Sequence, residues 1–243
     1  MNLKAEKMFS KIPGTSLAGV MREYATIHLM ETDSSCKSKQ KEEEKRKCAE
    51  KEIKKYFGDE DRQGILRFYD AQILLFPVSS IQGTVWITTK ELLEYWFGEV
   101  KNQNVDKLLI QEDIKDRAYA IKGINIDKPL NLGWLLLEVN SITDNKEVVL
   151  PDNLTNFVKR IVLVSDRLFS QIVNDNLEVR TSVKIDPETG TAEAGKLFTY
   201  EAIPRGTVLG FEISCFSFSN AEKKQTASNN SLSLLSHILN YLA

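Results

Sequence analysis

The stretch from residue 179 to residue 203 constrains the fold of this chain more than any other. Strand-like sequence runs through 179–185 and returns at 197–203, and between the two runs stands the turn Asp186-Pro187-Glu188-Thr189-Gly190-Thr191. Proline presets a turn φ and glycine supplies a positive φ, so the chain reverses its direction here. Two strand-like runs joined by such a turn predict a β-hairpin.

The rest of the chain alternates strand-like and helix-like segments. Runs rich in β-branched and aromatic residues predict strands at 65–68, 71–78, 84–89, 161–164 and 208–218, with a turn at Ser79-Ser80 and alternating strands and loops over about 105–150. Apolar residues at helical spacing predict helices from residue 15 or 16 to about 27, and at 91–97, 153–161, 166–173 and 232–242. This mixture, with pairing between distant segments, indicates an α+β fold.

A polar and charge-rich segment from about 32 to 58 interrupts this pattern. From Lys37 to Tyr56 there are nine Lys and Arg residues against five Glu. The segment is either a solvated helix that ends at Gly58 or a disordered insertion. Because the formal net charge of the whole chain is −2, any surface for nucleic acid must be a local basic stripe.

The three cysteines, Cys36, Cys48 and Cys215, are too few and too scattered for a disulfide framework, which favours a reducing cytoplasm. Cys36 and Cys48 together with His28 fall short of the four ligands of a structural zinc site, so no metal site is expected. Residues 1–10 contain no apolar run typical of a signal peptide. The apolar stretches are far shorter than a membrane span, so no membrane partner is expected.

A glycine-flanked turn, Pro13-Gly14-Thr15-Ser16-Leu17-Ala18-Gly19, leads into the first predicted helix. Thr15 or Ser16 can cap this helix, because either hydroxyl can accept a bond from an unpaired backbone N–H. The exposed N–H groups and the helix dipole also favour a phosphate at this point. On spacing alone, the simple helix cap is the favoured interpretation.

The predicted hairpin carries residues that suit RNA. Phe198 and Tyr200 can stack on an extruded base, and Lys184, Lys196 and Arg205 can reach phosphates. An ordinary hairpin whose aromatic rings face a core would contain the same residues, and composition alone favours this second interpretation.

Three segments in this order resemble the RAMP superfamily of CRISPR proteins, and within it the backbone subunits of type III-B (Cmr) effector complexes. The segments are 12–22, 70–83 and 185–197 followed by 200–204, and the likeness spans about residues 11–215. The resemblance implies a single domain over 1–243 with a modified ferredoxin-like (RRM-like) palm. In this palm the segment at about 32–58 is a helical insertion and the hairpin at about 179–204 is a protruding thumb.

The resemblance also implies a function. In this family several copies stack along one guide RNA, each thumb kinks the guide–target duplex, and an aspartate-bearing loop cuts the target RNA near each kink with a divalent metal such as magnesium. This implies a cytoplasmic subunit in antiviral defence whose partners are a guide (CRISPR) RNA, a target RNA, copies of itself and other effector subunits. The residues expected to contact RNA are Lys11, Gly14, Thr15, Ser16, Arg22, Ser79, Ser80, Lys184, Lys196, Tyr200 and Arg205.

The sequence departs from the family pattern in three places. The family's first strand and its cleaving aspartate precede the first helix, whereas residues 1–10 contain no aspartate. The family's last strand has no counterpart, and basic residues common in the family are replaced at Ala18, Ser79 and Gln82. We therefore expect an RNA-binding subunit with no catalytic residue and no cofactor of its own.

Three alternatives stay open at this point. A backbone subunit of the related Csm-type complex would have a similar hairpin. A stand-alone guide-processing endoribonuclease on a similar fold would need a histidine general base near a glycine-rich C-terminal loop, and His28 and His237 are the only histidines. A structural or interaction module without an RNA role would need none of these residues.

Overall fold

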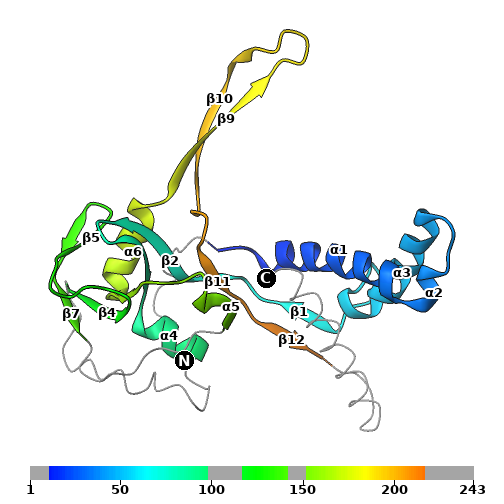
Figure 1. Cartoon of the computed structure of the whole chain (residues 1–243). Helices are drawn as coiled ribbons and strands as arrows, with labels where there is room; N and C mark the ends of the chain where they lie inside the picture. Colours follow the sequence, from blue (N-terminus) through cyan, green and yellow to red (C-terminus); the bar gives the residue numbers. More distant parts are fainter. Residues whose placement is uncertain (1–10, 98–116, 142–151, 217–243) are drawn as a thin grey trace. The chain divides into compact units, whose positions relative to one another are not determined.

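The computed structural model describes residues 11–97, 117–141 and 152–216 (Figure 1). These residues belong to two compact units, Ile73–Gly210 and Lys11–Gln72 with the described start of Phe211–Ala243. The predicted helix at 232–242 and parts of the segment at 105–150 lie outside the described residues. Residues 1–10 and 217–243 also lie outside the described residues. The predicted lack of the family's first and last strands concerns these two segments.

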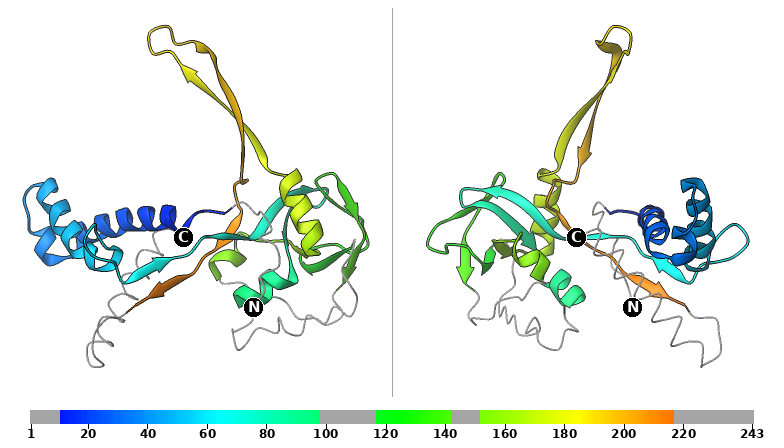
Figure 2. Two further views of the ribbon diagram at one scale, coloured as in Figure 1. Left: turned by 180° about the vertical axis from the view of Figure 1, so that it is seen from behind. Right: turned by 45° about the vertical axis from the view of Figure 1, so that its right-hand side comes forward.

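The first unit is built on a mixed sheet of six strands in the order β11-β2-β3-β8-β4-β7 (Figure 2). The strands are β2 (Gln72–Ser80), β3 (Gly83–Thr88), β4 (Ala118–Lys122), β7 (Val139–Ser141), β8 (Ile161–Leu163) and β11 (Val208–Gly210). β3 pairs antiparallel with β2 and parallel with β8, and β4 pairs antiparallel with β8 and parallel with β7. The expected α+β class is confirmed by this sheet together with its helices.

Apolar side chains of this sheet enter two buried clusters. Ile73, Phe76 and Val78 of β2 pack with apolar residues of α6 (Asp166–Asp175). Leu74 and Leu75 join a second cluster that contains Leu93 of α4 (Lys90–Phe97). A nearly continuous apolar run such as β2 is typical of a strand that is covered on both faces.

Two short hairpin strands, β5 (Leu130–Leu132) and β6 (Leu135–Leu137), complete the first unit together with α5 (Asp152–Thr155) and the long hairpin described below. Leu130, Leu132 and Leu137 are buried in the cluster that contains α6. This contact fixes the β5–β6 hairpin against the sheet, because the three side chains leave water only in that position.

The second unit contains three helices and a pair of strands among its described residues. They are α1 (Gly14–Thr32), α2 (Ser34–Lys37), α3 (Glu42–Phe57), β1 (Leu66–Phe68) and β12 (Ile213–Cys215), and β1 pairs antiparallel with β12. Its small core joins Met21 and Ala25 of α1 to Ile53 of α3. The charge-rich segment is therefore a helix over α3, and the alternative of disorder is wrong there. As predicted, Gly58 ends this helix, with a φ of 82° that favours glycine.

Cys36 of α2 and Cys48 of α3 form a disulfide, and Cys215 is a free exposed cysteine. This pair contradicts the expectation that the cysteines form no disulfide. The sequence separation of 12 residues does not reveal the pairing, because the two sulfurs meet only when α3 folds back beside α2.

Several predicted boundaries were wrong. β2 continues through Ser79 and Ser80, and the turn lies between Ser80 and Gly83, which pair with each other and allow a φ of 90° at Gly83. The predicted helix at 153–161 is only α5, because its Asn and Thr residues are weak helix formers. The predicted strand at 208–218 is divided into β11 and β12, since the two halves belong to different sheets.

No helix among the described residues combines the length and the apolar character that a membrane crossing needs.

Candidate nucleic-acid interface

The long hairpin of β9 (Glu178–Ile185) and β10 (Ala192–Ala202) is present, and Figure 1 shows it as an extended two-stranded ribbon. Among the residues that the structure describes, these two strands pair only with each other. The turn forms as its residues predict: Asp186 N donates to Thr191 O at 2.9 Å, and Gly190 N donates to Asp186 O at 2.8 Å. β10 begins five residues earlier than predicted, with an irregular register between Ala192 and Leu197.

One face of the hairpin is aromatic and basic. Phe198 and Tyr200 lie directly opposite Ser182 and Arg180, and residues paired in this way point to the same side of a ladder. The ring centroids of Phe198 and Tyr200 are 6.4 Å apart. Lys184 lies on the same side, two residues beyond Ser182. Arg180 Nη2 lies 2.7 Å from Glu178 Oε2 on the same face, so this cation already has a carboxylate partner. Two neighbouring rings with cations beside them are groups that can stack on bases and contact phosphates.

The two rings are exposed. Phe198 is 59% exposed and Tyr200 is 47% exposed, so the interpretation in which these aromatic residues face a core is wrong for the described residues. Lys196 is exposed directly before the regular part of the ladder. Arg205 is also exposed, and its backbone N donates to Glu178 Oε1 at 3.4 Å.

The other face of the hairpin mixes aliphatic side chains with polar ones, since Thr199 lies opposite Thr181 and Glu201 opposite Val179. Leu197 lies opposite Val183, and Val179 lies on the same side of β9. Val179 is 71% exposed and Leu197 is 66% exposed. Two strands in water are at best marginally stable, and exposed aliphatic side chains add apolar area that a partner would bury.

The start of α1 differs from the predicted helix cap. Pro13 is the N-cap residue and no side chain caps the helix, so Thr15 and Ser16 lie within the first turn as exposed residues. Gly14 N instead donates to Asp70 Oδ1 at 2.8 Å, and Lys11 Nζ lies 2.6 Å from Asp70 Oδ2. The Lys11 ammonium and the Gly14 N–H hold the pKa of Asp70 below its usual range.

A carboxylate therefore occupies part of the site where a phosphate was the alternative to a simple helix cap. Asp70 lies in the segment 70–83 of the family pattern, but the sequence did not show that it reaches Gly14 across 56 positions. Gly14 itself is required for close packing, because a Cβ there would lie 2.3 Å from Phe68 O. At this helix start, Thr15 and Ser16 are exposed, and their hydroxyls are within reach of a ligand in solution.

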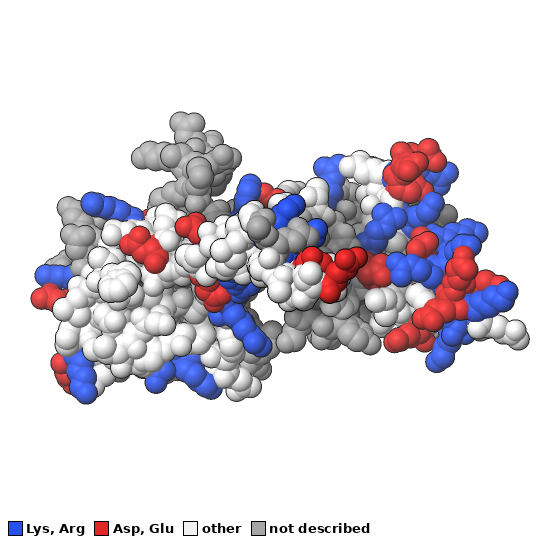
Figure 3. Space-filling model, turned by 90° about the horizontal axis from the view of Figure 1, so that it is seen from above, with Lys and Arg blue, Asp and Glu red and all other residues white. Residues whose placement is uncertain are grey.

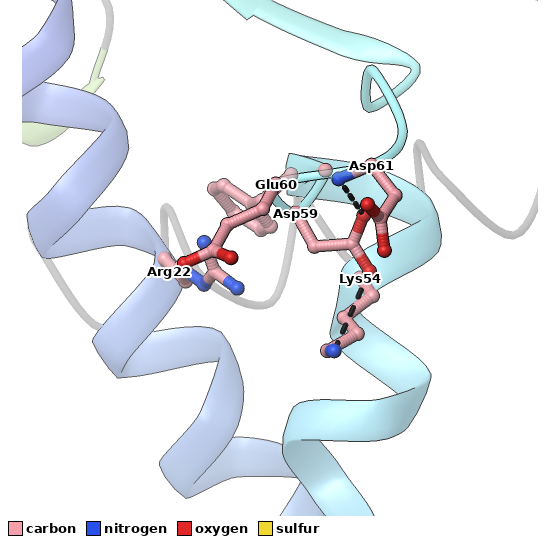
Figure 4. Close-up of a pocket in the computed structure, with 7 residues that line it drawn as sticks. Arg22, Lys54, Asp59, Glu60 and Asp61 are labelled. Carbon is pink, nitrogen blue, oxygen red and sulfur yellow. Dashed lines mark hydrogen bonds and ion pairs between the residues drawn. The ribbon is translucent and has the colours of Figure 1, made fainter.

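Arg22 lies in the second unit and lines an open groove of about 670 Å³ (Figure 4). The loop residues Asp59, Glu60 and Asp61 line the same groove, together with Lys54, which pairs with Asp59 at 3.4 Å. Figure 4 shows Arg22 reaching toward this acidic loop. Three carboxylates beside the guanidinium of Arg22 disfavour a phosphate in this groove. The RNA contact of Arg22 therefore stays a prediction that this geometry does not support.

Ser79 and Ser80 shape the β2–β3 turn. Ser80 Oγ donates to Gly83 O at 2.6 Å, and Ser79 O accepts a bond from Gly133 N at 3.3 Å. Gly133 and Trp134 form the tip of the β5–β6 hairpin, and Trp134 is 93% exposed. Trp134 is not among the residues that the sequence predicts to contact RNA, although a glycine between two leucine-rich runs is a signal for a turn.

Charged side chains are unevenly spread on the face that Figure 3 shows. Cations and anions are intermixed over the helices of the second unit, whereas large areas of the first unit show no charged side chain. Part of the basic excess of α3 is neutralised by ion pairs such as Arg46 with Glu23 and Lys47 with Glu43. On the face that Figure 3 shows, phosphate contacts would therefore come from individual side chains and not from one broad basic area.

The structure places the predicted RNA contacts in three groups. Lys184, Lys196, Tyr200 and Arg205 belong to the hairpin or its base, and Ser79 and Ser80 to the β2–β3 turn, all in the first unit. The third group belongs to the second unit and comprises Lys11, Gly14, Thr15, Ser16 and Arg22. The hairpin group is the one that combines an exposed ring, that of Tyr200, with cations.

Comparison with known proteins gives a consistent result. The family model described as the RAMP superfamily matches residues 7–242. The "CRISPR system Cmr endoribonuclease Cmr4" of Pyrococcus furiosus is 26% identical over 216 residues, which cover 82% of this chain and 68% of that protein.

Solved structures are similar in fold. A chain in the cryo-EM structure of type III-B Cmr-beta bound to cognate target RNA has a TM-score of 0.64 and 18% identity, and the match covers 88% of this chain and 74% of that chain. Oligomeric Cmr4 from Pyrococcus furiosus has a TM-score of 0.55 and 19% identity, with coverage of 99% and 80%.

Proposed function

The chain belongs to the RAMP superfamily, and from this premise we propose that it is a guide-RNA-binding backbone subunit of a type III-B CRISPR effector complex. The observation that carries the proposal is the hairpin face on which Phe198 and Tyr200 are exposed next to Arg180 and Lys184. The relative named Cmr4 and the similar chain in a complex bound to target RNA support it.

The two faces of the hairpin suit two kinds of contact. Stacking of one base on an aromatic ring contributes about 1–3 kcal/mol, so the face with Phe198 and Tyr200 can hold unpaired bases. On the other face, the exposed aliphatic side chains of Val179, Val183 and Leu197 can contact an apolar surface of a neighbouring subunit. An oligomeric structure of Cmr4 from Pyrococcus furiosus supports an assembly of copies.

Guide RNA is held mainly through its phosphates in this proposal. Affinity should fall steeply with salt and vary little with base sequence, because lysine, arginine and backbone amide contacts to phosphates release counterions and do not read bases. Filter binding of labelled guide RNA to the full chain over a salt series tests this. A strong base preference that survives high salt would contradict it.

The finer part of the proposal is that this chain binds RNA without cutting it. Its support is that the segment directly before the first helix motif, 1–10, contains no aspartate to match the family's cleaving residue. The test is incubation of the chain with guide, target RNA and magnesium, followed by separation of the products by size. Regularly spaced cuts that disappear when one carboxylate of this chain is replaced would overturn this part and leave the RNA-binding role intact.

A further inference from the structure

Arg160 lies at the β2–β3 end of the sheet in the first unit, directly before β8. Its backbone O accepts a bond from Trp86 N at 2.9 Å, which fixes the residue against β3. A Cβ at Gly123 would lie 3.4 Å from Arg160 Cγ, and a Cβ at Gly83 would lie 3.2 Å from Arg160 Nη1. The stem of Arg160 therefore lies on one glycine and its guanidinium on another.

Both glycines have a backbone that other residues rarely adopt. φ is 90° at Gly83 and 64° at Gly123, so a side chain at either position is disfavoured by strain as well as by contact with its neighbours. A Cβ at Gly123 would also lie 2.4 Å from Lys159 O. These two bare backbone positions leave room for the side chain of Arg160 to lie along the backbone beside the turn.

The guanidinium of Arg160 has no hydrogen bond or ion pair with any residue that the structure describes, although the residue is half-buried. The neighbouring polar groups already have partners. Asn125 N donates to Gln82 Oε1 at 2.9 Å, and Ile81 N donates to Asn131 Oδ1 at 2.7 Å. No described residue thus accepts from the five N–H donors of this half-buried cation, and a phosphate or carboxylate matches their planar geometry.

The surroundings favour a phosphate on a nucleic acid over a protein carboxylate. The adjoining segments 122–128 and 159–160 contain Lys122, Lys128, Lys159 and Arg160 against a single acidic residue, Asp127. Ile81 and Trp134, at the two hairpin tips that meet here, are exposed apolar side chains. Local positive charge with an exposed aromatic ring is the combination that binds single-stranded nucleic acid.

We propose that Arg160, whose side chain lies beside Gly83 and Gly123, binds a phosphodiester group of single-stranded guide RNA at the β2–β3 end of the sheet. The proposal rests on the RNA-binding function proposed above and adds a contact outside the hairpin and outside the residues that the sequence pointed to.

The test measures fluorescence anisotropy of a labelled single-stranded RNA of mixed sequence with the full chain. Arg160→Ala should weaken binding by about tenfold, as expected for loss of a charge-assisted contact, and should reduce the slope of log K against log salt by about 0.7. Arg160→Lys should restore the slope and only part of the affinity, because an ammonium lacks the planar fork. Lys159→Ala removes the same charge from the adjacent exposed residue and should have a smaller effect.

Each result discriminates between explanations. Equal losses in Arg160→Ala and Lys159→Ala would show a diffuse charge effect and would overturn the site. Normal RNA binding with reduced self-association in Arg160→Ala would assign the guanidinium to a protein carboxylate and would overturn it as well. If Arg160→Ala binds RNA like the wild type, only this contact fails, whereas a wild-type chain that binds no RNA removes the proposed function together with it.

Discussion

Replacing Lys196 and Tyr200 together with alanine separates a functional hairpin from a structural one. Tyr200 is 47% exposed on the aromatic face, and Lys196 is exposed before the ladder. Loss of one stacked base costs about 1–3 kcal/mol, which corresponds to a loss of about 5- to 160-fold in affinity. Loss of one phosphate contact should lower the salt slope by about 0.7.

Stability should change little in the same variant. A surface substitution usually alters the free energy of unfolding by about 0.5 kcal/mol or less. For a chain of this size the melting temperature should therefore fall by only about 2 °C. The matched control is Thr199→Ala. Thr199 is exposed on the same strand but points to the other face of the hairpin, where it is paired with Thr181.

Two assays on the same protein samples give the answer. Anisotropy with labelled guide RNA reports affinity, and differential scanning fluorimetry reports the melting temperature. We expect weak RNA binding by the double variant with a nearly normal melting temperature, and normal values of both for Thr199→Ala. A double variant that unfolds several degrees earlier and binds RNA normally would show that the hairpin belongs to a core, and it would refute the assignment of this face to RNA.

Three further predictions concern the second unit. In a denaturant titration, Gly14→Ala should destabilise the chain by about 1–3 kcal/mol, because the added Cβ would clash with Phe68 O. Gly19→Ala is the control and should stabilise α1 by up to about 1 kcal/mol, because nothing lies within 4 Å of a Cβ there. Equal effects of the two substitutions would contradict this packing. The lowered pKa of Asp70 contributes stability that is present above the unfolded pKa of about 3.8 and is lost as the pH falls through the folded pKa. Asp70→Asn should therefore reduce the fall of the melting temperature at acid pH. An unchanged fall would count against the pairing of Asp70 with Lys11. A reducing agent should lower the melting temperature of the wild type but not that of a Cys36→Ser/Cys48→Ser variant. For a loop near this length, loss of the disulfide should reduce the free energy of unfolding by roughly 3 kcal/mol. Equal responses of the two proteins would argue against the disulfide.

Local chemistry made several elements predictable from the sequence. The turn Asp186-Pro187-Glu188-Thr189-Gly190-Thr191 specifies a chain reversal by itself, and the structure has it with Gly190 at a φ of 67°. Apolar spacing likewise predicted α6, and the β-branched run at 161–164 predicted β8. In each case the preference is set by residues a few positions apart, so no knowledge of the rest of the chain is needed.

The candidate RNA contacts were predictable only in part. The RNA contacts of the hairpin could be predicted from the residue types and from the family resemblance. The sequence could not tell whether Phe198 and Tyr200 face a core or the solvent. That distinction depends on which element, if any, covers the strand pair. In the described residues none does, since β9 and β10 pair only with each other and both rings are exposed.

The sequence by itself determined the class of fold, the hairpin and the family, because turn chemistry, periodicity and ordered motifs are properties of neighbouring residues. The tertiary structure alone decided which distant groups meet: Asp70 at the start of α1, Cys36 with Cys48, and Arg160 between Gly83 and Gly123. The physical reason is that these contacts join segments separated by 12 to 77 positions, and their geometry exists only after helices and strands have packed.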